Sequence, residues 1–285
     1  MQIKDLFQSN RPVISCEVFP PKKDTDVESI YQALEHICAL APDFISVTYG
    51  AGGSGNANQT AQIAAHIQQK HHIPALAHLT CVGAGPAQID QLLHDMRNKG
   101  LSNVLALRGD FPDDIVPSGE LLYASELIRQ IQKQDSFSIG AACYPEGHID
   151  CLELDTDTLH LRQKQEAGAD FFITQLFFDN DHFFRFLDRA QAAGVTLPIS
   201  AGVMPILGRS QIERMIFLCG VSLPSEIIKL LHRYQHNPAD LQKAGVEHAA
   251  HQMENLLRRG AQGVHIYTMN KPDIAATCIR HLRAL

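Results

Sequence analysis

The sequence predicts an α/β fold, a single (β/α)8 TIM barrel with extra helices between strands 7 and 8. Three observations support this. The 285-residue chain is somewhat longer than a typical barrel of about 250 residues. Hydrophobic residues make up 45% of it and charged residues only 19%, which favours a large core over disorder. Short apolar runs alternate with longer helical patterns, as parallel strands joined by helices require.

Eight runs have the length and apolar character of strands that are buried on both faces. They cover Val13–Val18, Phe44–Tyr49, Ala75–Thr80, Val104–Leu107, Ser138–Cys143, Phe171–Gln175, Pro198–Ala201 and Val264–Tyr267. Eight such units favour a closed barrel, and a doubly wound open sheet is the alternative. No linker or low-complexity tract interrupts them, so we expect one domain over residues 1–285.

The segments between these runs have the spacing of amphipathic helices. One apolar stripe runs along residues 27–40, and a second follows Pro86. The longest segment lies between the last two strands. Asn237, as N-cap, and Pro238, at the first helical position, predict the start of one extra helix there.

Composition excludes several classes of function. The net charge is -7, and no basic run offers the clustered cations that nucleic-acid binding needs. The apolar stretches are too short to span a membrane, and the N-terminus has no signal-peptide pattern. The seven cysteines form no C-x-x-C pair, which favours free thiols. We therefore expect a cytoplasmic protein.

Polar residues at the carboxyl ends of barrel strands point into the active site. The first strand ends in Glu17, flanked by the apolar Cys16 and Val18. Poor solvation favours the neutral form of a carboxylic acid and suits it to proton donation. A Glu17 side chain paired with an internal cation is the structural alternative.

Other predicted strand ends carry polar groups as well. Arg108, Gly109 and Asp110 place a cation, a glycine and a carboxylate together, which suits a polar heterocycle; a local Arg108–Asp110 ion pair is the alternative. Gln175 offers both a donor and an acceptor. A lone histidine such as His78 is as often structural as functional.

Two further patterns allow two interpretations each. Asp157, His160 and Lys164 share one helix face, which is either a solvated stripe or a wall for a nucleotide tail. Residues 50–55 read G-x-G-x-x-G after a strand. No acidic residue follows about 20 positions later to hold a ribose, so we expect a flexible ligand-binding loop rather than a dinucleotide fingerprint.

Histidines gather at two places, His66 with His71 and His72, and His248 with His251. Neither group shows a matching carboxylate or cysteine at metal-ligand spacing along the chain. We therefore expect no metal site.

Seven short motifs follow one another along the chain in an order and spacing that closely resemble the methylenetetrahydrofolate reductases. One motif would be weak, but seven in register are specific. They are CEVFPPK at 16–22, SVTYGAGG at 46–53, AHLTC at 77–81, ALRGD at 106–110, YPEGH at 144–148, AGAD at 167–170 and TQLFFD at 174–179.

The resemblance implies a barrel that binds FAD noncovalently and uses NADH or NADPH as co-substrate. The implied reaction is ping-pong reduction of 5,10-methylenetetrahydrofolate to 5-methyltetrahydrofolate, in one-carbon metabolism and methionine supply. The resemblance also implies a homo-oligomer of the short bacterial type, without the C-terminal regulatory domain of eukaryotic relatives.

The resemblance further implies residue roles. Glu17 would protonate N10 of the folate, and Asp110 would bind the pterin and influence the flavin. Gln175, Gln211 and Lys271 would contact the substrates. The implied FAD-binding set is Thr48, Tyr49, Ala51, His78, Arg108, Gly109, Asp110, Tyr123, Tyr144, His148, Asp157, His160 and Lys164.

Two other hypotheses remain from the sequence. A different flavin barrel, such as a proline dehydrogenase-like oxidase, would explain the fold, but not Glu17 together with the Arg108-Gly109-Asp110 strand end. A catalytically silent barrel that binds folate would not need an acid at Glu17.

Overall fold

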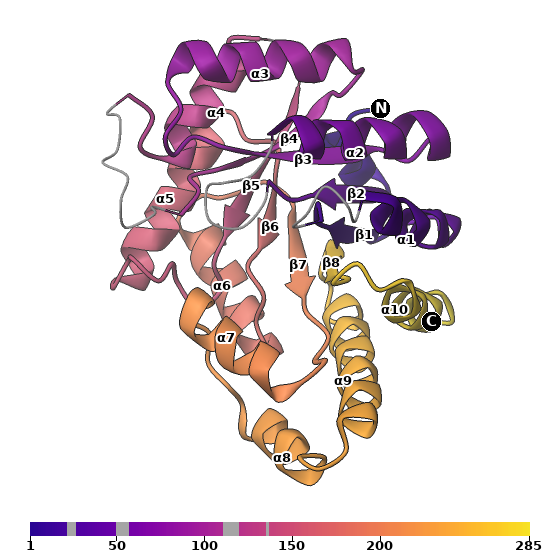
Figure 1. Cartoon of the computed structure of the whole chain (residues 1–285). Coiled ribbons are helices and arrows are strands. Elements are labelled where there is room, and N and C mark those ends of the chain that lie inside the picture. Colours follow the sequence, from indigo (N-terminus) through magenta and orange to yellow (C-terminus); the bar gives the residue numbers. More distant parts are fainter. Residues whose placement is uncertain (22–26, 50–56, 111–119, 135–136) are drawn as a thin grey trace.

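The computed structural model describes residues 1–21, 27–49, 57–110, 120–134 and 137–285, and eight parallel strands close into a barrel (Figure 1). Each strand pairs with the next, and β1 pairs with β8 through Val13 and Gly263, which excludes an open sheet. The strands are β1 (Val13–Val18), β2 (Phe44–Val47), β3 (Ala75–Thr80), β4 (Asn103–Leu107), β5 (Ser138–Cys143), β6 (Phe171–Thr174), β7 (Ile199–Val203) and β8 (Gly263–Tyr267).

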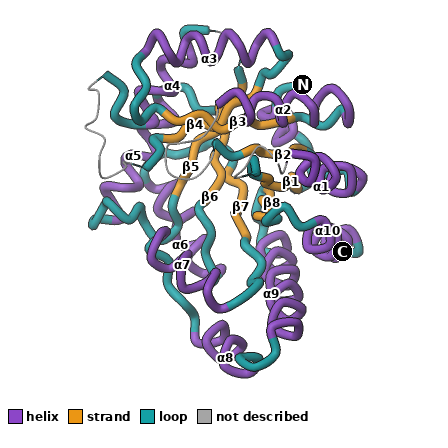
Figure 2. Tube along the Cα trace, viewed as in Figure 1, coloured by secondary structure: helices purple, strands orange, loops and turns teal. Residues whose placement is uncertain are grey.

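Helices surround the strands, as Figure 2 shows. None of those in the described ranges combines the length and apolarity needed to cross a bilayer. They are η1 (Ile3–Gln8), α1 (Val27–Ala39), α2 (Ala57–His71), α3 (Pro86–Asn98), α4 (Ala124–Gln132), α5 (Leu154–Glu166), α6 (Asn180–Ala192), α7 (Arg209–Cys219), α8 (Ser225–Arg233), α9 (Pro238–Arg258) and α10 (Pro272–Arg283).

The predicted barrel is confirmed, including the extra helices α7, α8 and α9 between β7 and β8. The predicted start of α9 is also confirmed, because the Asn237 side chain accepts a hydrogen bond from the Asp240 N–H. Strand bounds differ by up to two residues. The second strand ends at Val47 rather than Tyr49, since its pairing with both neighbouring strands stops there.

The amino-terminal end of the barrel is filled by side chains. Helix η1 lies across it, with the Ile3 N–H donating to Asn103 Oδ1 at 2.8 Å and the Lys4 N–H to Ser138 Oγ at 3.2 Å. The barrel interior next to η1 is also apolar. A ligand can therefore reach the strands only from their carboxyl ends. This apolar cluster consists of Ile3, Val13, Phe44, Leu76, Leu105, Phe171 and Ile173.

Close packing joins α9 to the segment that follows β7. Gly245 of α9 lies so near that segment that an added Cβ would meet the carbonyl oxygen of Ile206 at 2.1 Å. The missing side chain therefore permits α9 to pack against the barrel.

We predict that Gly245→Ala lowers the free energy of unfolding by about 1–3 kcal/mol, the usual cost of overpacking. The carbonyl of Ile206 is backbone and cannot rotate away, so α9 must shift, which outweighs the gain of about 1 kcal/mol in helix propensity. Urea unfolding measures the change. Gly208→Ala is the control, because nothing lies within 4 Å of its added Cβ. Equal stability of the two variants would contradict this packing.

Candidate functional site

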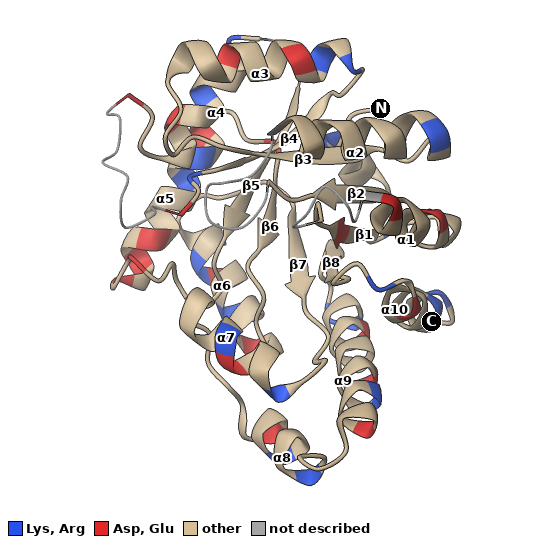
Figure 3. Cartoon of the chain, viewed as in Figure 1, with Lys and Arg blue, Asp and Glu red and all other residues tan. Residues whose placement is uncertain are grey.

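One carboxyl group stands inside the barrel. Glu17, at the end of β1, is the single Asp, Glu, Lys or Arg within the eight strands. In Figure 3 the charged residues lie mainly on the helices, and the strands are largely tan. The Glu17 side chain is 18% exposed, so it is largely enclosed but still reaches the open end of the barrel.

Three polar side chains from neighbouring strands face this carboxyl group. Glu17 Oε2 lies 3.6 Å from Nε2 of His78 and 3.6 Å from Nε2 of His265. The Ser46 hydroxyl donates to the same oxygen at 3.4 Å. Among the residues that the structure describes, the facing groups are thus imidazoles and a hydroxyl, rather than the lysine or arginine that an internal ion pair would require.

His265 is completely buried and held on both sides of its ring. Its Nδ1 lies 2.7 Å from Ser15 Oγ, and its Nε2 lies 3.2 Å from Ser46 Oγ. The ring also stacks on Phe44 with centroids 5.9 Å apart. This arrangement fixes the imidazole beside Glu17.

Our sequence analysis missed His265, Ser46 and Ser15. The usable signal is that Ser15 and Glu17 of β1 lie two residues apart and therefore face the same way. His265 and Tyr267 of β8 have the same spacing. Polar residues at alternate positions of otherwise apolar strands mark the barrel interior near the active-site end.

His78 presents an unsatisfied nitrogen to the site. The residue is 6% exposed, and burial lowers its pKa to about 4, an effect that the Glu17 charge opposes. The ring is therefore neutral at neutral pH. Its Nε2 is buried and has no hydrogen-bond partner among the described residues. An orphaned buried nitrogen costs stability unless a ligand supplies the partner.

A cavity of about 350 Å³ opens at the ends of β4, β5 and β6, at the same end of the barrel as Glu17, although neither Glu17 nor His78 lines it. Five sequence-predicted residues line it, together with four that were not predicted. The predicted ones are Arg108, Asp110, Tyr144, His148 and Gln175, and the others are Ile149, Asp150, Leu218 and Cys219. The cavity thus combines cationic, anionic, amide and aromatic groups, which suits a polar ring system.

Arg108 has a different partner from the one considered in the sequence analysis. Its Nη2 donates to Asp150 Oδ2 at 2.6 Å, and this hydrogen bond lowers the pKa of Asp150. Asp110 is exposed at the cavity wall. The Asp150 side chain is 59% exposed, so the contact with Arg108 lies at the rim, where a ligand can replace it.

The wall formed by β5 and α5 carries paired charges. Lys164 Nζ donates to the Ala142 carbonyl at 2.8 Å and lies 5.5 Å from the centre of the Tyr144 ring. Burial lowers the pKa of Lys164, while the neighbouring Asp157 opposes that shift. Burial raises the pKa of Asp157, against the charges of Lys164 and His148. Asp157 and Lys164 are thus partly buried and influence each other's pKa, whereas His160 on the same helix is exposed.

The remaining predicted cofactor residues lie around the same end of the barrel or outside the described residues. Thr48 follows β2, and its carbonyl accepts from Thr60 Oγ1 at 2.9 Å. Burial raises the pKa of Tyr49, which is partly buried. Tyr123 is 59% exposed at the N-cap of α4, and His160 is exposed on α5.

The loop assignments are only partly described. Gly109 has a φ of +87°, which glycine adopts without strain. Ala51 and the glycine-rich segment 50–55 lie outside the described residues, so the Ala51 assignment stays a prediction.

Two predicted substrate residues stand apart from the cavity wall. Both ends of the Gln211 amide bind the preceding loop: Oε1 accepts from the Leu207 N–H at 2.7 Å, and Nε2 donates to the Pro205 carbonyl at 3.3 Å. Lys271 is exposed at the N-cap of α10. Neither is among the residues that line the 350 Å³ cavity.

Tyr267 is a further buried group at this end, on β8. Its hydroxyl donates to the Thr174 carbonyl at 2.8 Å, and burial raises its pKa well above the usual value. The contact requires a glycine at 202, because an added Cβ would lie 2.4 Å from the Thr174 oxygen and 2.8 Å from the Tyr267 hydroxyl.

A larger cavity of about 570 Å³ lies at the opposite, amino-terminal end of the strands. It is lined by chain termini and helix ends, and the charged residues there include the Arg11–Asp43 ion pair. No sequence-predicted site residue lines it. The enclosed carboxyl group and the orphaned imidazole lie at the other end, so we place the chemistry beside the smaller cavity.

The expectation that no carboxylate accompanies the histidine groups is wrong. Glu35 of α1 lies beside His66 and His71, and Glu254 lies between His251 and His281. Spacing along the chain missed Glu35 because it comes from a neighbouring helix, and it overlooked Glu254, which follows His251 by three residues on α9.

The comparisons with known proteins identify relatives along almost the whole chain. The sequence model of the family described as methylenetetrahydrofolate reductase matches residues 2–283. The 5,10-methylenetetrahydrofolate reductase of Escherichia coli (strain K12) is 31% identical over 263 residues, covering 92% of this chain and 88% of its own. Methylenetetrahydrofolate reductase (NADH) 1 of Arabidopsis thaliana is 34% identical over 296 residues and 99% of this chain, which spans only half of the plant protein.

A solved structure shares the fold. It is described as an uncharacterized protein from Clostridium thermocellum that binds two copies of 5-methyl-5,6,7,8-tetrahydrofolic acid. The TM-score is 0.70 at 17% identity, with 100% of this chain and 98% of the other covered.

We predict a pH dependence of stability that comes from His78. The folded-state pKa of about 4 lies below the value of about 6.5 for an unfolded histidine, so the unfolded chain binds more protons between these values. Stability should therefore fall as the pH drops from 6.5 to 4, by up to roughly 3 kcal/mol from this residue. Urea unfolding of the wild type and His78→Gln across that range isolates the effect. Parallel pH profiles would contradict a buried, neutral His78.

Proposed function

The chain belongs to the methylenetetrahydrofolate reductase family, and from this premise we propose that it reduces 5,10-methylenetetrahydrofolate to 5-methyltetrahydrofolate. The proposed reaction is ping-pong, uses noncovalent FAD and NADH or NADPH, and takes place in one domain, residues 1–285. The observation that carries the proposal is the enclosed Glu17 carboxyl group at the end of the barrel where the 350 Å³ cavity opens. The names of the plant relatives specify NADH, which supports NADH as the donor.

The residues present fit FAD. The buried His78 Nε2 has no partner among the described residues and faces the barrel's open end, where a ring edge can supply one. Arg108, Tyr144 and His148 line the adjacent cavity, and the Lys164–Asp157 wall continues from it. These residues would hold the cofactor. When bound, FAD accepts a hydride from the nicotinamide and delivers it to the one-carbon unit of the folate.

Glu17 would supply the proton that opens the substrate's five-membered ring at N10. Ser46 donates to Glu17 Oε2, and His265 braces that hydroxyl, so the carboxyl group is oriented before substrate arrives. Burial keeps the His78 ring neutral at neutral pH, so this side chain places no positive charge beside Glu17. Enclosure by the barrel wall keeps bulk water from competing for that proton.

Asp110 and Gln175 would position the folate. Both line the cavity, Asp110 after β4 and Gln175 after β6. Together they offer hydrogen-bond acceptors and an amide donor. A pterin ring presents both donors and acceptors along its edge. This complementarity supports the proposed substrate class.

The free cysteines support a reducing compartment such as the cytoplasm as the site of action. All seven are unpaired, and five of them are buried. Burial raises the pKa of Cys81 to about 11, so this thiol stays protonated and unreactive at neutral pH.

We predict that Glu17→Gln separates the two half-reactions. NADH should still reduce the bound flavin at nearly the wild-type rate, because hydride transfer from the nicotinamide needs no proton from Glu17. Reoxidation by methylenetetrahydrofolate should slow by about 10²–10⁴-fold, the usual contribution of general acid catalysis. Anaerobic stopped-flow absorbance measures both steps.

The control is Glu247→Gln, an isosteric change at an exposed position on α9, which should alter neither step. Equal loss in both half-reactions of Glu17→Gln would refute the proton-donor role. Intact folate binding without any hydride transfer in the wild type would instead favour a catalytically silent folate-binding barrel.

A further inference from the structure

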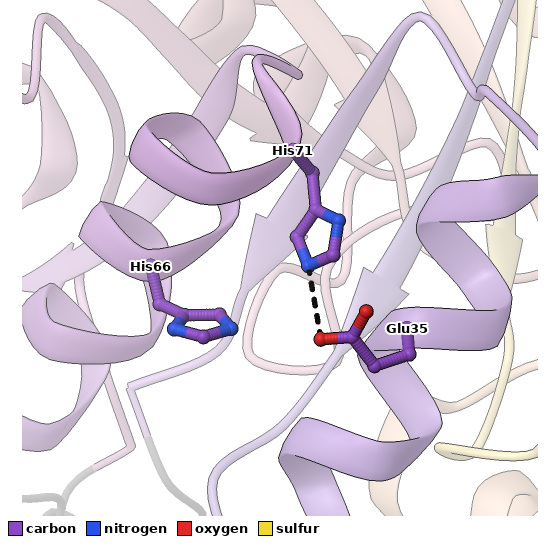
Figure 4. Close-up of side chains that lie close together, drawn as sticks. All are labelled: Glu35, His66 and His71. Carbon is purple, nitrogen blue, oxygen red and sulfur yellow. Dashed lines mark ion pairs between the residues drawn. The ribbon is translucent and has the colours of Figure 1, made fainter.

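Three metal-ligating side chains converge on the outside of the barrel between α1 and α2. Glu35 comes from α1, and His66 and His71 come from the second half of α2 (Figure 4). The three ligand atoms all lie within 4.8 Å of one another, and Glu35 Oε1 is 3.7 Å from His71 Nε2. Both imidazoles are partly buried, whereas Glu35 is exposed.

Both histidines carry nitrogen atoms without partners. The Nε2 atoms of His66 and His71 are buried, and neither has a hydrogen-bond partner among the residues described. The Tyr31 ring packs on His66 with centroids 4.4 Å apart, which shields that side from solvent. Burial also lowers the pKa of His66. Buried polar side-chain atoms are normally hydrogen-bonded, and these two Nε2 atoms are not, although His71 Nε2 lies 3.7 Å from Glu35 Oε1.

We propose that Glu35, His66 and His71 form a binding site for a divalent cation of the zinc class. Two imidazoles and one carboxylate are a known zinc ligand set, which leaves a fourth position for water. Ligand atoms around tetrahedral zinc lie roughly 3.3 Å apart, given bonds of about 2.0–2.1 Å. Small side-chain rotations would bring the three atoms from their present separations to that geometry.

Lys70 competes with the cation for Glu35. Its ammonium group forms an ion pair with Glu35 Oε1, and the two side chains are 54% and 44% exposed. Exposed ion pairs of this kind contribute little, because water and salt screen them. The cation would therefore displace the ammonium group, and Lys70 would lower its affinity without preventing binding.

The site is remote from Glu17. Helix α2 ends at His71 and leads into the start of β3, so the site lies toward the amino-terminal end of the barrel. A cation there would link α1 to α2 and stabilise the outer wall, because an ion that binds only the folded chain favours folding.

A second group with the same residue types is the internal comparison. Glu254 lies with His251 and His281, but His281 Nε2 and Arg258 Nη2 each lie 2.7 Å from a Glu254 oxygen. That carboxylate is already satisfied, so we do not extend the proposal to it.

Zinc binding by the purified chain tests the proposal. A competition assay with a chromogenic chelator measures the zinc affinity. His66→Gln/His71→Gln should lose one equivalent of zinc or bind it at least about 10-fold more weakly. Even loss of a residue that only hydrogen-bonds a metal ligand typically costs that much. Lys70→Gln should tighten binding by up to about fivefold. His251→Gln/His281→Gln, the matched control, should bind as the wild type does. Zinc should raise the melting temperature of the wild type, but not that of His66→Gln/His71→Gln.

Unchanged zinc stoichiometry and affinity in His66→Gln/His71→Gln would overturn the site, and so would loss of zinc in the His251→Gln/His281→Gln control. Circular dichroism checks that the variants fold. If His66→Gln/His71→Gln does not fold, Glu35→Gln decides instead, because loss of the charged ligand should weaken zinc binding by at least about 10-fold and unchanged binding would overturn the site. Flavin reduction by NADH should stay at the wild-type rate in every variant, since none of these residues lies at the catalytic end.

Discussion

The site depends on one physical constraint: a carboxyl group stands inside a largely apolar barrel and, among the described residues, faces no lysine or arginine. Glu17 meets this constraint with a hydroxyl from Ser46 and two imidazoles, His78 and His265, each imidazole 3.6 Å away. Enclosing a polar group costs free energy unless other polar groups face it. The neighbouring strands therefore place hydroxyl and imidazole groups at the level of Glu17.

The closed amino-terminal end gives this group its direction. Helix η1 and the apolar cluster fill the amino-terminal end of the barrel. Glu17 is therefore accessible from the carboxyl ends of the strands. At that end the residues that line the cavity differ from the group proposed to transfer a proton, Glu17. In the proposed function, Arg108, Tyr144 and the Lys164–Asp157 wall would hold the cofactor, while Glu17 would act on the folate.

Much of the fold could be predicted from the sequence, because strand and helix patterns are local. The eight apolar runs and the Asn237–Pro238 helix start depend on residues close together in the chain, and the structure contains all of them. Contacts between distant segments could not be predicted in this way. His265 meets Glu17 only because β8 closes against β1, and Arg108 meets Asp150 across a loop. Glu35 reaches His66 and His71 only through helix packing.

The family motifs compensated for part of that gap, since they marked strand ends that the barrel then brought together. Five of the marked residues line one cavity, which local patterns alone would not have shown. They assigned no role to Ser46, although it begins the SVTYGAGG motif, and none of them includes His265; both residues lie next to Glu17 or its hydrogen-bond partner. Ser46 and His265 lie on β2 and β8, the two strands that pair with β1, so the barrel closure brings them to Glu17.

The central claim is that this barrel transfers a hydride from a nicotinamide through a bound flavin to a folate. An anaerobic titration of the purified wild-type protein tests it most directly. We expect yellow protein whose flavin absorbance is bleached by NADH or NADPH and fully restored by 5,10-methylenetetrahydrofolate, with 5-methyltetrahydrofolate formed in equal amount. Colourless protein that does not take up added FAD, or reduced flavin that methylenetetrahydrofolate fails to reoxidise, would contradict it.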